Sequence, residues 1–192
     1  MQERTSNRKR TETTTAALIS AARGLFVEKG FAETSTPEVV KAAKVTRGAL
    51  YHHFADKTDL FRAVVQTEAA AVAAHIAGGP MSEQSPAEAM QDGARRYFEA
   101  MAVAGRTHLL LIDGPAVLGR TEMDTIDQET GAAELKAGLQ ALSDAGRPFP
   151  TDAMAAMLSA AFDRAALEIS TGAPSEPFLA ALDRLIESLL PS

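Results

Sequence analysis

Apolar residues recur every three or four positions along most of the chain, which is the spacing of amphipathic α-helices. Near the start of the chain, Leu18, Ala22, Leu25 and Phe26 form such a stripe, which ends at Gly30. Glycine readily adopts the left-handed conformation that closes a helix. The pattern therefore predicts a first helix that buries one face and stops at Gly30.

A second helix is predicted to begin near Thr36, because Ser35-Thr36-Pro37-Glu38 has the serine-x-x-glutamate pattern of a capping box. The proline fits in the first turn, where its missing N–H is no loss. This helix is expected to end near Lys44. Its apolar positions are Val39, Val40 and Ala43.

The stretch from Val45 to Phe54 predicts a third helix with two different faces. Thr46 can cap its start by accepting a backbone N–H, and Leu50 shares a buried face with Phe54 at helical spacing. The opposite face carries Arg47, Tyr51 and His52. About three residues separate this helix from the second one, which is the joint of a helix-turn-helix. The sequence therefore predicts a helix built to touch DNA.

After Phe54 every predicted segment is again helical, with glycine and proline between the segments. No run alternates in the manner of a half-buried strand. Helices are expected over residues 57–77, 85–105, 107–112, 121–145, 152–170 and 178–190. Asp113-Gly114-Pro115 is expected to form a turn that interrupts the chain after residue 112. The sequence thus predicts an all-α protein.

The formal net charge of −6 is unevenly divided along the 192 residues. Residues 1–62 hold 11 Lys and Arg against 7 Asp and Glu, whereas residues 63–192 hold 8 against 18. The N-terminal part can therefore approach phosphate, and the acidic remainder should face away from DNA. Arg8-Lys9-Arg10 is interpreted either as an arm that approaches DNA or as a solvated, disordered end.

The composition excludes several classes of protein. The chain has no cysteine, which excludes a disulfide framework and a thiolate nucleophile and fits a reducing cytoplasm. No stretch approaches the roughly 20 apolar residues of a membrane span. The polar start Met1-Gln2-Glu3-Arg4 is not typical of a signal peptide. We therefore expect a cytoplasmic protein with no membrane partner.

The N-terminal third of the chain contains an ordered set of residues: Ala17, Ala21-Ala22, Leu25-Phe26, Gly30-Phe31, Thr34-Ser35, Val39, Ala43, Val45 to Phe54, Asp56-Lys57, Leu60-Phe61 and Val64. In this set the chain resembles the TetR family of bacterial transcriptional repressors. Such an ordered set is far more specific than a lone helix-turn-helix pattern. A phrase from Leu110 to Ala116 also resembles one branch of the family. The resemblance implies a helix-turn-helix DNA-binding domain over residues 1–60 and a larger helical effector-binding and dimerisation domain over residues 61–192.

One position departs from the family pattern. Lys44 stands in the turn between the second and third helices, where the family often has glycine. A lysine held in a left-handed conformation costs about 1–2 kcal/mol. We therefore expect this turn, and with it the angle of the third helix, to differ slightly from the family.

The resemblance also implies how the protein meets a palindromic duplex. The third helix would enter a major groove, Arg47 would read guanine bidentately, and residues at helix N-termini would hold phosphates. The expected DNA contacts are Ser35, Thr36, Thr46, Arg47, Gly48, Ala49, Tyr51, His52 and Lys57. A bound effector would tilt the linking helix over 57–77 and so change the separation of the two reading helices of a dimer.

The last two predicted helices have apolar faces that are wide for terminal surface helices. Two copies could pack them as a four-helix bundle about a two-fold axis, and the family resemblance implies such a homodimer. The alternative is a core within one chain. The expected interface residues are Met157, Phe162, Leu182, Leu185, Ile186 and Leu189.

The expected effector is a largely apolar small molecule bound within residues 80–170, where few cations occur. Arg106 or His108 could orient it. The expected contacts are Tyr97, Phe98, Met101, His108, Met123 and Phe162. Methionine adapts to irregular ligands, although at helical spacing it equally suits a plain core.

No group of residues indicates catalysis. His52 and His53 point about 100° apart on a helix, so they cannot readily share a metal ion. No nucleophile, base and orienting group occur together, and we expect no catalytic residue, metal or cofactor. Two alternatives to an effector-controlled repressor remain open: a DNA-binding regulator without an effector, and a small helical enzyme.

Overall fold

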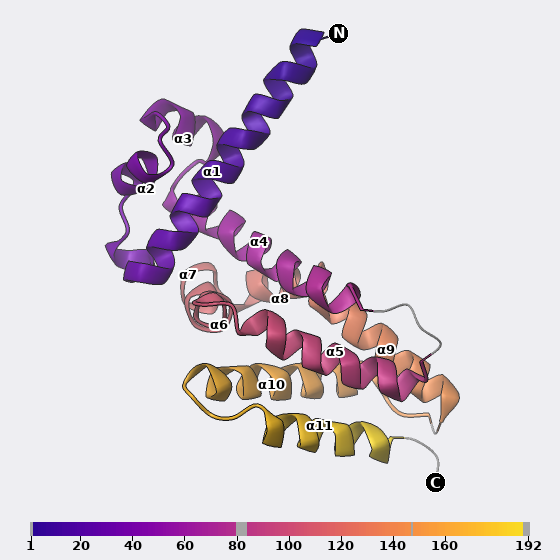
Figure 1. Cartoon of the computed structure of the whole chain (residues 1–192). Helices are drawn as coiled ribbons and strands as arrows, with labels where there is room; N and C mark the ends of the chain where they lie inside the picture. Colours follow the sequence, from indigo (N-terminus) through magenta and orange to yellow (C-terminus); the bar gives the residue numbers. More distant parts are fainter. Residues whose placement is uncertain (1, 80–83, 147, 190–192) are drawn as a thin grey trace.

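The computed structural model describes residues 2–79, 84–146 and 148–189, and over these residues it contains helices and no strand. The all-α prediction is confirmed. The helices form two lobes, with α1 to α3 in the N-terminal lobe and α5 to α11 in the C-terminal lobe (Figure 1). Helix α4 starts at the small lobe and runs along the large one.

The N-terminal lobe contains α1 (Gln2–Glu33), α2 (Thr36–Ala42) and α3 (Arg47–His53), followed by α4 (Lys57–Ala77). The four helices close around one apolar core, as the periodicity predicts. Its fully buried members are Leu18, Phe26, Val39, Leu50, Leu60, Phe61 and Val64. The ring of Phe61 meets those of Phe26 and Phe31 edge-on, with centroids 5.1 Å apart in both pairs. These contacts attach α4 firmly to the small lobe.

Two backbone positions in this lobe have positive φ. Gly30 interrupts the helical conformation near the end of α1 with φ 77° and ψ 169°. The positive φ expected of this glycine is confirmed, but the residue forms a kink instead of a left-handed helical cap, and α1 continues to Glu33. Lys44 adopts φ 54° in the turn between α2 and α3. The lysine therefore takes the left-handed conformation that glycine adopts most readily, and the turn carries local strain.

The C-terminal lobe combines longer helices with several short ones. Its bounds are α5 Pro86–Met101, α6 Arg106–His108, the π-helix η1 Leu109–Asp113, α7 Gly114–Leu118, α8 Arg120–Gln128, α9 Gly131–Ala145, α10 Thr151–Ser170 and α11 Glu176–Ser188. Helices α10 and α11 lie at the edge of the molecule (Figure 1), where α10 packs mainly against α9 and α11 packs against α5. Among the described residues, no helix is long and apolar enough to cross a membrane.

Two expectations about this lobe are wrong. The single helix predicted over 121–145 is broken at Thr130, whose φ is −128°. The Thr130 hydroxyl donates to the Ile126 carbonyl at 2.7 Å and its backbone N–H donates to the Asp127 carbonyl at 3.0 Å, so α8 ends in a tightened last turn. The predicted turn at Asp113-Gly114-Pro115 is also absent, because η1 runs directly into α7. Pro115 lies in the first turn of α7, where its missing N–H costs nothing.

Candidate DNA-binding surface and effector domain

Helix α3 is held by one polar cap and two apolar anchors. The Ala49 backbone N–H donates to the Thr46 side chain at 3.1 Å, so the predicted N-cap is confirmed. Leu50 and Phe54 are buried in the small lobe. The local sequence therefore fixes which face of α3 points outward. That face carries Arg47, Gly48, Tyr51 and His52, all of which are exposed.

The exposed face of α3 is joined to the start of α2. The hydroxyls of Thr36 and Tyr51 lie 3.4 Å apart, and the Arg47 guanidinium lies 5.5 Å from the centre of the Tyr51 ring. The hydrogen bond with Thr36, followed by that with Arg47, lowers the pKa of Tyr51. The three side chains form one exposed cluster, which we call the reading cluster. It combines a guanidinium with hydroxyls, the groups that meet bases and phosphates.

The start of α2 is capped by a carboxylate that also pairs with α1. Glu38 accepts hydrogen bonds from the Ser35 backbone N–H at 3.0 Å and from the Ser35 hydroxyl at 2.8 Å. It also accepts one from Lys29 at 2.7 Å. The hydrogen bond from Lys29, together with those from Ser35, lowers the pKa of Glu38 to about 2. The predicted capping box is thus formed, and the Ser35 hydroxyl is already engaged within it.

Lys57 is placed differently from the phosphate contact expected for it. Its ammonium donates to the carbonyls of Phe31, Ala32 and Thr34 at 2.7, 3.3 and 3.0 Å. It also lies 4.3 Å from the centre of the Phe31 ring. An ammonium has three donors, and all three are used here. Lys57 therefore closes the end of α1 in this structure and has no donor directed at solvent.

The two neighbouring histidines have separate surroundings. His52 is exposed, whereas His53 is half-buried with its Nδ1 3.2 Å from the Thr15 hydroxyl of α1. His53 therefore fastens α3 to α1. Within the described part of the chain, no group of three or more His, Asp and Glu side chains is arranged to hold a metal ion.

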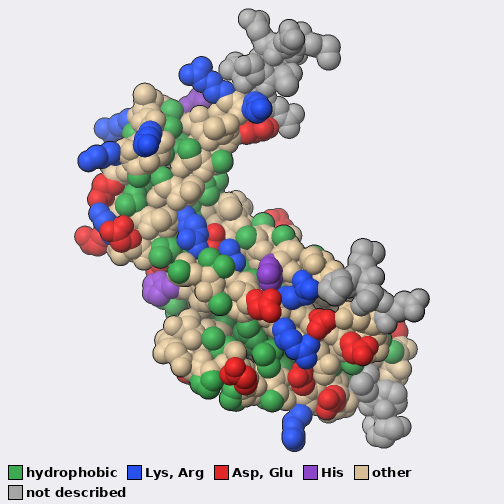
Figure 2. Space-filling view, in the orientation of Figure 1, with side chains coloured by type: hydrophobic (Ala, Val, Ile, Leu, Met, Phe, Trp, Pro, Cys, Tyr) green, Lys and Arg blue, Asp and Glu red, His purple; other side chains and the backbone are tan. Residues whose placement is uncertain are grey.

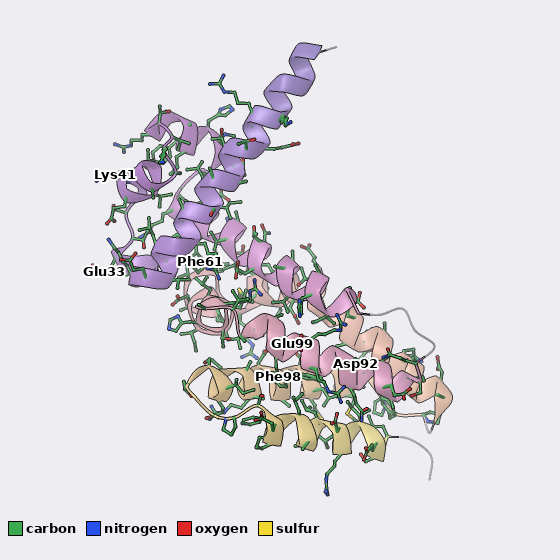
Figure 3. All side chains as sticks on the ribbon, viewed as in Figure 1. Glu33, Lys41, Phe61, Asp92, Phe98 and Glu99 are labelled. Atoms are coloured by element: carbon green, nitrogen blue, oxygen red, sulfur yellow. The ribbon has the colours of Figure 1, made fainter. Side chains whose placement is uncertain are left out.

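Lys and Arg side chains gather on the outer edge of the N-terminal lobe, over α2 and α3 (Figure 2). Lys41, Lys44 and Arg47 are exposed in this region. Lys41 of α2 points away from the molecule (Figure 3). The positive charge predicted from the sequence therefore lies on the same side as the reading cluster.

The C-terminal lobe contains a cluster of three aromatic rings where α5 meets α10. Tyr97, Phe98 and Phe162 have ring centroids 5.3–5.8 Å apart, and Phe98 points toward α10 (Figure 3). The Tyr97 hydroxyl donates to Asp163 at 2.9 Å. Burial raises the pKa of Asp163, and burial beside this carboxylate raises that of Tyr97. The structure thus brings together three of the expected effector contacts and adds a partly buried acid.

The other three expected effector residues have different surroundings. Met101 is buried in α5. Met123 packs on Gly114, where an added β-carbon would lie 2.8 Å from its sulfur. The side chain of His108 is 65% exposed and lies 3.0 Å from Asp113. His108 therefore lies outside the buried aromatic cluster.

Arg106, a suggested orienting group for the effector, is instead a buried structural residue. It donates to Glu68 of α4 at 2.8 Å, and both residues are at most 8% exposed. Sequence reasoning missed Glu68, although a signal was present. Glu68 follows Val64 by four positions and precedes Val72 by four, so it lies on the buried face of α4.

The expected dimer residues divide into two groups. Phe162, Leu182 and Ile186 are buried within the single chain, and Leu189 packs partly against the same core. Met157 and Leu185 are 70% and 50% exposed. The surface of α10 and α11 that is open to a partner is therefore narrower than the sequence suggested, and it centres on these two side chains.

Comparisons with known proteins agree with this architecture. Residues 18–64 match the bacterial regulatory proteins of the tetR family, and residues 87–191 match the tetracyclin repressor-like C-terminal domain. The TetC protein of transposon Tn10 from Escherichia coli is 36% identical over 76 residues, which cover 40% of this chain and 39% of TetC. The match to this curated relative thus spans well under two thirds of its length.

Solved structures extend the similarity over both lobes. A TetR-family transcriptional regulator from Pectobacterium atrosepticum is 29% identical, with a TM-score of 0.70 and 95% of each chain covered. RolR, solved with the ligand resorcinol, is 18% identical with a TM-score of 0.69, covering 96% of this chain and 98% of its own. The latter likeness concerns the fold alone. With a capped reading helix in its small lobe and family matches in both lobes, the chain belongs to the TetR family of DNA-binding transcriptional regulators.

Proposed function

We propose that the protein is a homodimeric repressor that leaves its operator when a small molecule binds the C-terminal lobe. The observation that carries the DNA-binding part is the reading cluster, in which Arg47, Tyr51 and Thr36 are held together on the exposed face of α3. A repressor bound to DNA acts in the cytoplasm. In this protein the DNA-binding domain ends near residue 60, and the effector-binding and dimerisation domain follows it.

Each protomer sets α3 in a major groove. Arg47 reads a guanine through its two parallel donors, while Tyr51 and His52 contact bases or backbone beside it. The starts of α2 and α3 hold phosphates, with Thr36, Thr46 and the backbone at Gly48 and Ala49 within reach. Ser35 contributes through its position at the start of α2, since its hydroxyl is bonded to Glu38.

Two protomers associate through α10 and α11. Met157 and Leu185 are large apolar side chains left exposed on these helices, and exposed apolar patches mark association sites. A two-fold axis there produces a four-helix bundle and directs both reading helices to the same face of DNA. The operator is then palindromic, with half-sites about 10 base pairs, or a multiple, apart.

The effector is a small, largely apolar molecule that enters the aromatic cluster of Tyr97, Phe98 and Phe162. Apolar walls with a few polar groups are typical of such sites. Tyr97 and Asp163 supply the polar group, because their hydrogen bond can be exchanged for one to a ligand. RolR, of the same fold, binds the small phenol resorcinol, which supports a compact aromatic ligand here.

Selection of bound duplexes from a random pool tests the proposal. We expect enrichment of a palindrome by the full-length protein and a two-to-one ratio of protein to DNA in sedimentation. Arg47→Ala should lose the preference at one base pair of each half-site. Arg120→Ala, a change at an exposed residue of α8 outside the reading and dimer helices, should keep the full palindrome. A panel of phenols, amines and hydrophilic metabolites is then screened for release. Binding as a monomer, or release by hydrophilic anions only, contradicts the proposal.

A further inference from the structure

A single buried carboxylate joins the two lobes. Glu68 of α4 is 5% exposed and lies between arginines from different parts of the chain. Arg23 of α1 donates to both of its oxygens, at 2.9 and 3.1 Å. Arg106 of α6 donates to Oε2 at 2.8 Å. Glu68 is thus the common partner of the helix that carries the DNA-binding lobe and of the first helix after α5.

Each arginine is also tied to the segment that leads from α5 to α6. Arg23 donates to the Ala104 carbonyl at 3.1 Å, and Arg106 donates to the Ala100 carbonyl at 2.6 Å. Next to them, Thr107 donates to the Met101 carbonyl at 2.9 Å. The end of α5 and the turn at 102–105 are therefore held in place by the side chains that hold Glu68.

The same turn presses directly on α1. Gly105 has φ +78°, and a β-carbon added there would lie 2.5 Å from both methyl groups of Val27. The backbone of the turn and the side chain of Val27 therefore meet with no space between them. Any displacement of the turn toward α1 must move α1, and any displacement away must open this contact.

The ionic part of this junction resists partial opening. Burial alone would raise the pKa of Glu68, but hydrogen bonds and charge from Arg23 and Arg106 outweigh it and lower the pKa. Withdrawing one arginine leaves a buried charge partly unpaired, which is strongly unfavourable. The junction is therefore either complete or opened to water, with few states in between.

We propose that Glu68 is the positioning residue that holds α1, and with it the reading helix, in the orientation that binds DNA. Movement of the turn at 102–105 withdraws Arg106, the next residue, from Glu68 and releases α1. The turn directly follows α5, the helix that carries Tyr97 and Phe98, so a molecule that displaces those rings reaches the junction through one helix. The expected change in DNA binding rests on the proposed function, whereas the expected change in the orientation of α1 does not.

The test uses the absence of cysteine in the natural chain. Cysteines introduced by Lys41→Cys in α2 and Glu134→Cys in α9, both exposed, carry spin labels across the two lobes. Labelled protein diluted into unlabelled protein gives the distance distribution within one chain. Glu68→Gln should broaden or shift this distribution. In unlabelled protein it should weaken binding to the selected duplex about 5- to 150-fold, the usual range for coupled sites.

The matched control is Glu122→Gln. Glu122 pairs with Arg62, so it also ties α4 to the C-terminal lobe, but through α8. The Glu122→Gln substitution should leave both the distance distribution and DNA binding close to those of the natural chain. Arg106→Lys, which keeps the charge but lacks the second donor to Ala100, should give an intermediate broadening. The Arg106→Lys variant replaces Glu68→Gln in the test if the Glu68→Gln protein does not fold.

The outcomes separate this inference from the proposed function. A broadened distribution for Glu68→Gln and a narrow one for Glu122→Gln support the junction even if no duplex is selected. Distributions identical to the natural chain in folded Glu68→Gln and Arg106→Lys overturn it, even if DNA binding by the natural chain is tight. Equal effects of Glu68→Gln and Glu122→Gln also overturn it, because any ion pair on α4 would then suffice.

Discussion

The ammonium of Lys57 donates to the Phe31 carbonyl at 2.7 Å and lies 4.3 Å from the centre of the Phe31 ring. A residue that starts α4 thus closes the end of α1, with two further carbonyls as partners. This arrangement makes Lys57 part of the small lobe's architecture.

Lys57→Ala should therefore lower the free energy of unfolding by about 1–3 kcal/mol, the cost of leaving polar groups without partners. Lys57→Met, which keeps the aliphatic stem, should lose a similar amount. Urea denaturation measures both. Unchanged unfolding, together with a salt slope of DNA binding reduced by about one, would restore the phosphate contact expected from the sequence.

Lys44→Gly should stabilise the protein by about 1 kcal/mol, because it removes a side chain from a residue with φ 54°. Lys41→Gly is the matched control. Lys41 lies in the last turn of α2, where glycine should cost about 0.5–1 kcal/mol. Opposite shifts in thermal midpoint are expected, and a loss of stability in both variants would show that the turn relaxes around Lys44.

Arg47→Ala should weaken DNA binding by about 1–3 kcal/mol and relax the preference at one base pair. Tyr51→Phe should cost less, because it removes only the hydroxyl that lies 3.4 Å from Thr36. Fluorescence anisotropy on the selected duplex and on single-base variants measures both changes. A uniform loss on every sequence for Arg47→Ala would assign this residue to the backbone.

Glu38 should contribute to acid sensitivity. Its pKa lies near 2 in the folded chain, below the usual value, so its contribution to stability is complete above about pH 4.5. That contribution declines as the pH falls toward 2. The difference in unfolding free energy between the natural chain and Glu38→Gln should therefore be constant near neutrality and shrink in this acidic range. A difference that grows on acidification would contradict the assignment.

Gly105→Ala should destabilise the fold by about 1–2 kcal/mol from backbone strain alone, with an added clash against Val27. In the double variant with Val27→Ala, the clash is removed while the strain remains. The two effects should therefore be non-additive, with the double variant more stable than the sum predicts. Strict additivity in denaturant unfolding would mean that the turn and α1 do not press on each other.

The small lobe could be predicted from sequence because its signals are local. Thr46 and the Ser35–Glu38 pair each act within four residues and make the expected contacts, and Gly30 takes the expected positive φ. Glu68 could not be assigned, because its partners lie 45 and 38 positions away. The carbonyl partners of Lys57 were likewise hidden, because they lie 23 to 26 positions away in the sequence.

The C-terminal lobe was harder to predict for a related reason. The break at Thr130 precedes Gly131, whose low helix propensity weakens a helix without deciding whether packing keeps it continuous. The buried state of Phe162 and Ile186 depends on how α10 and α11 pack against α5. A periodic stripe shows that a face is covered, but the tertiary fold decides whether the cover is the same chain or a second one.

The π-helix at Leu109–Asp113 has a consequence for the phase of the segment that follows. A π turn holds one residue more than an α turn, and each residue rotates a helix by about 100°. Gly114 directly follows the π turn and packs against Met123, so the direction it faces depends on the number of residues in that turn. Shortening 109–113 by one residue would turn another side chain of α7 toward α8, so this lobe tolerates substitutions there more readily than a change in length.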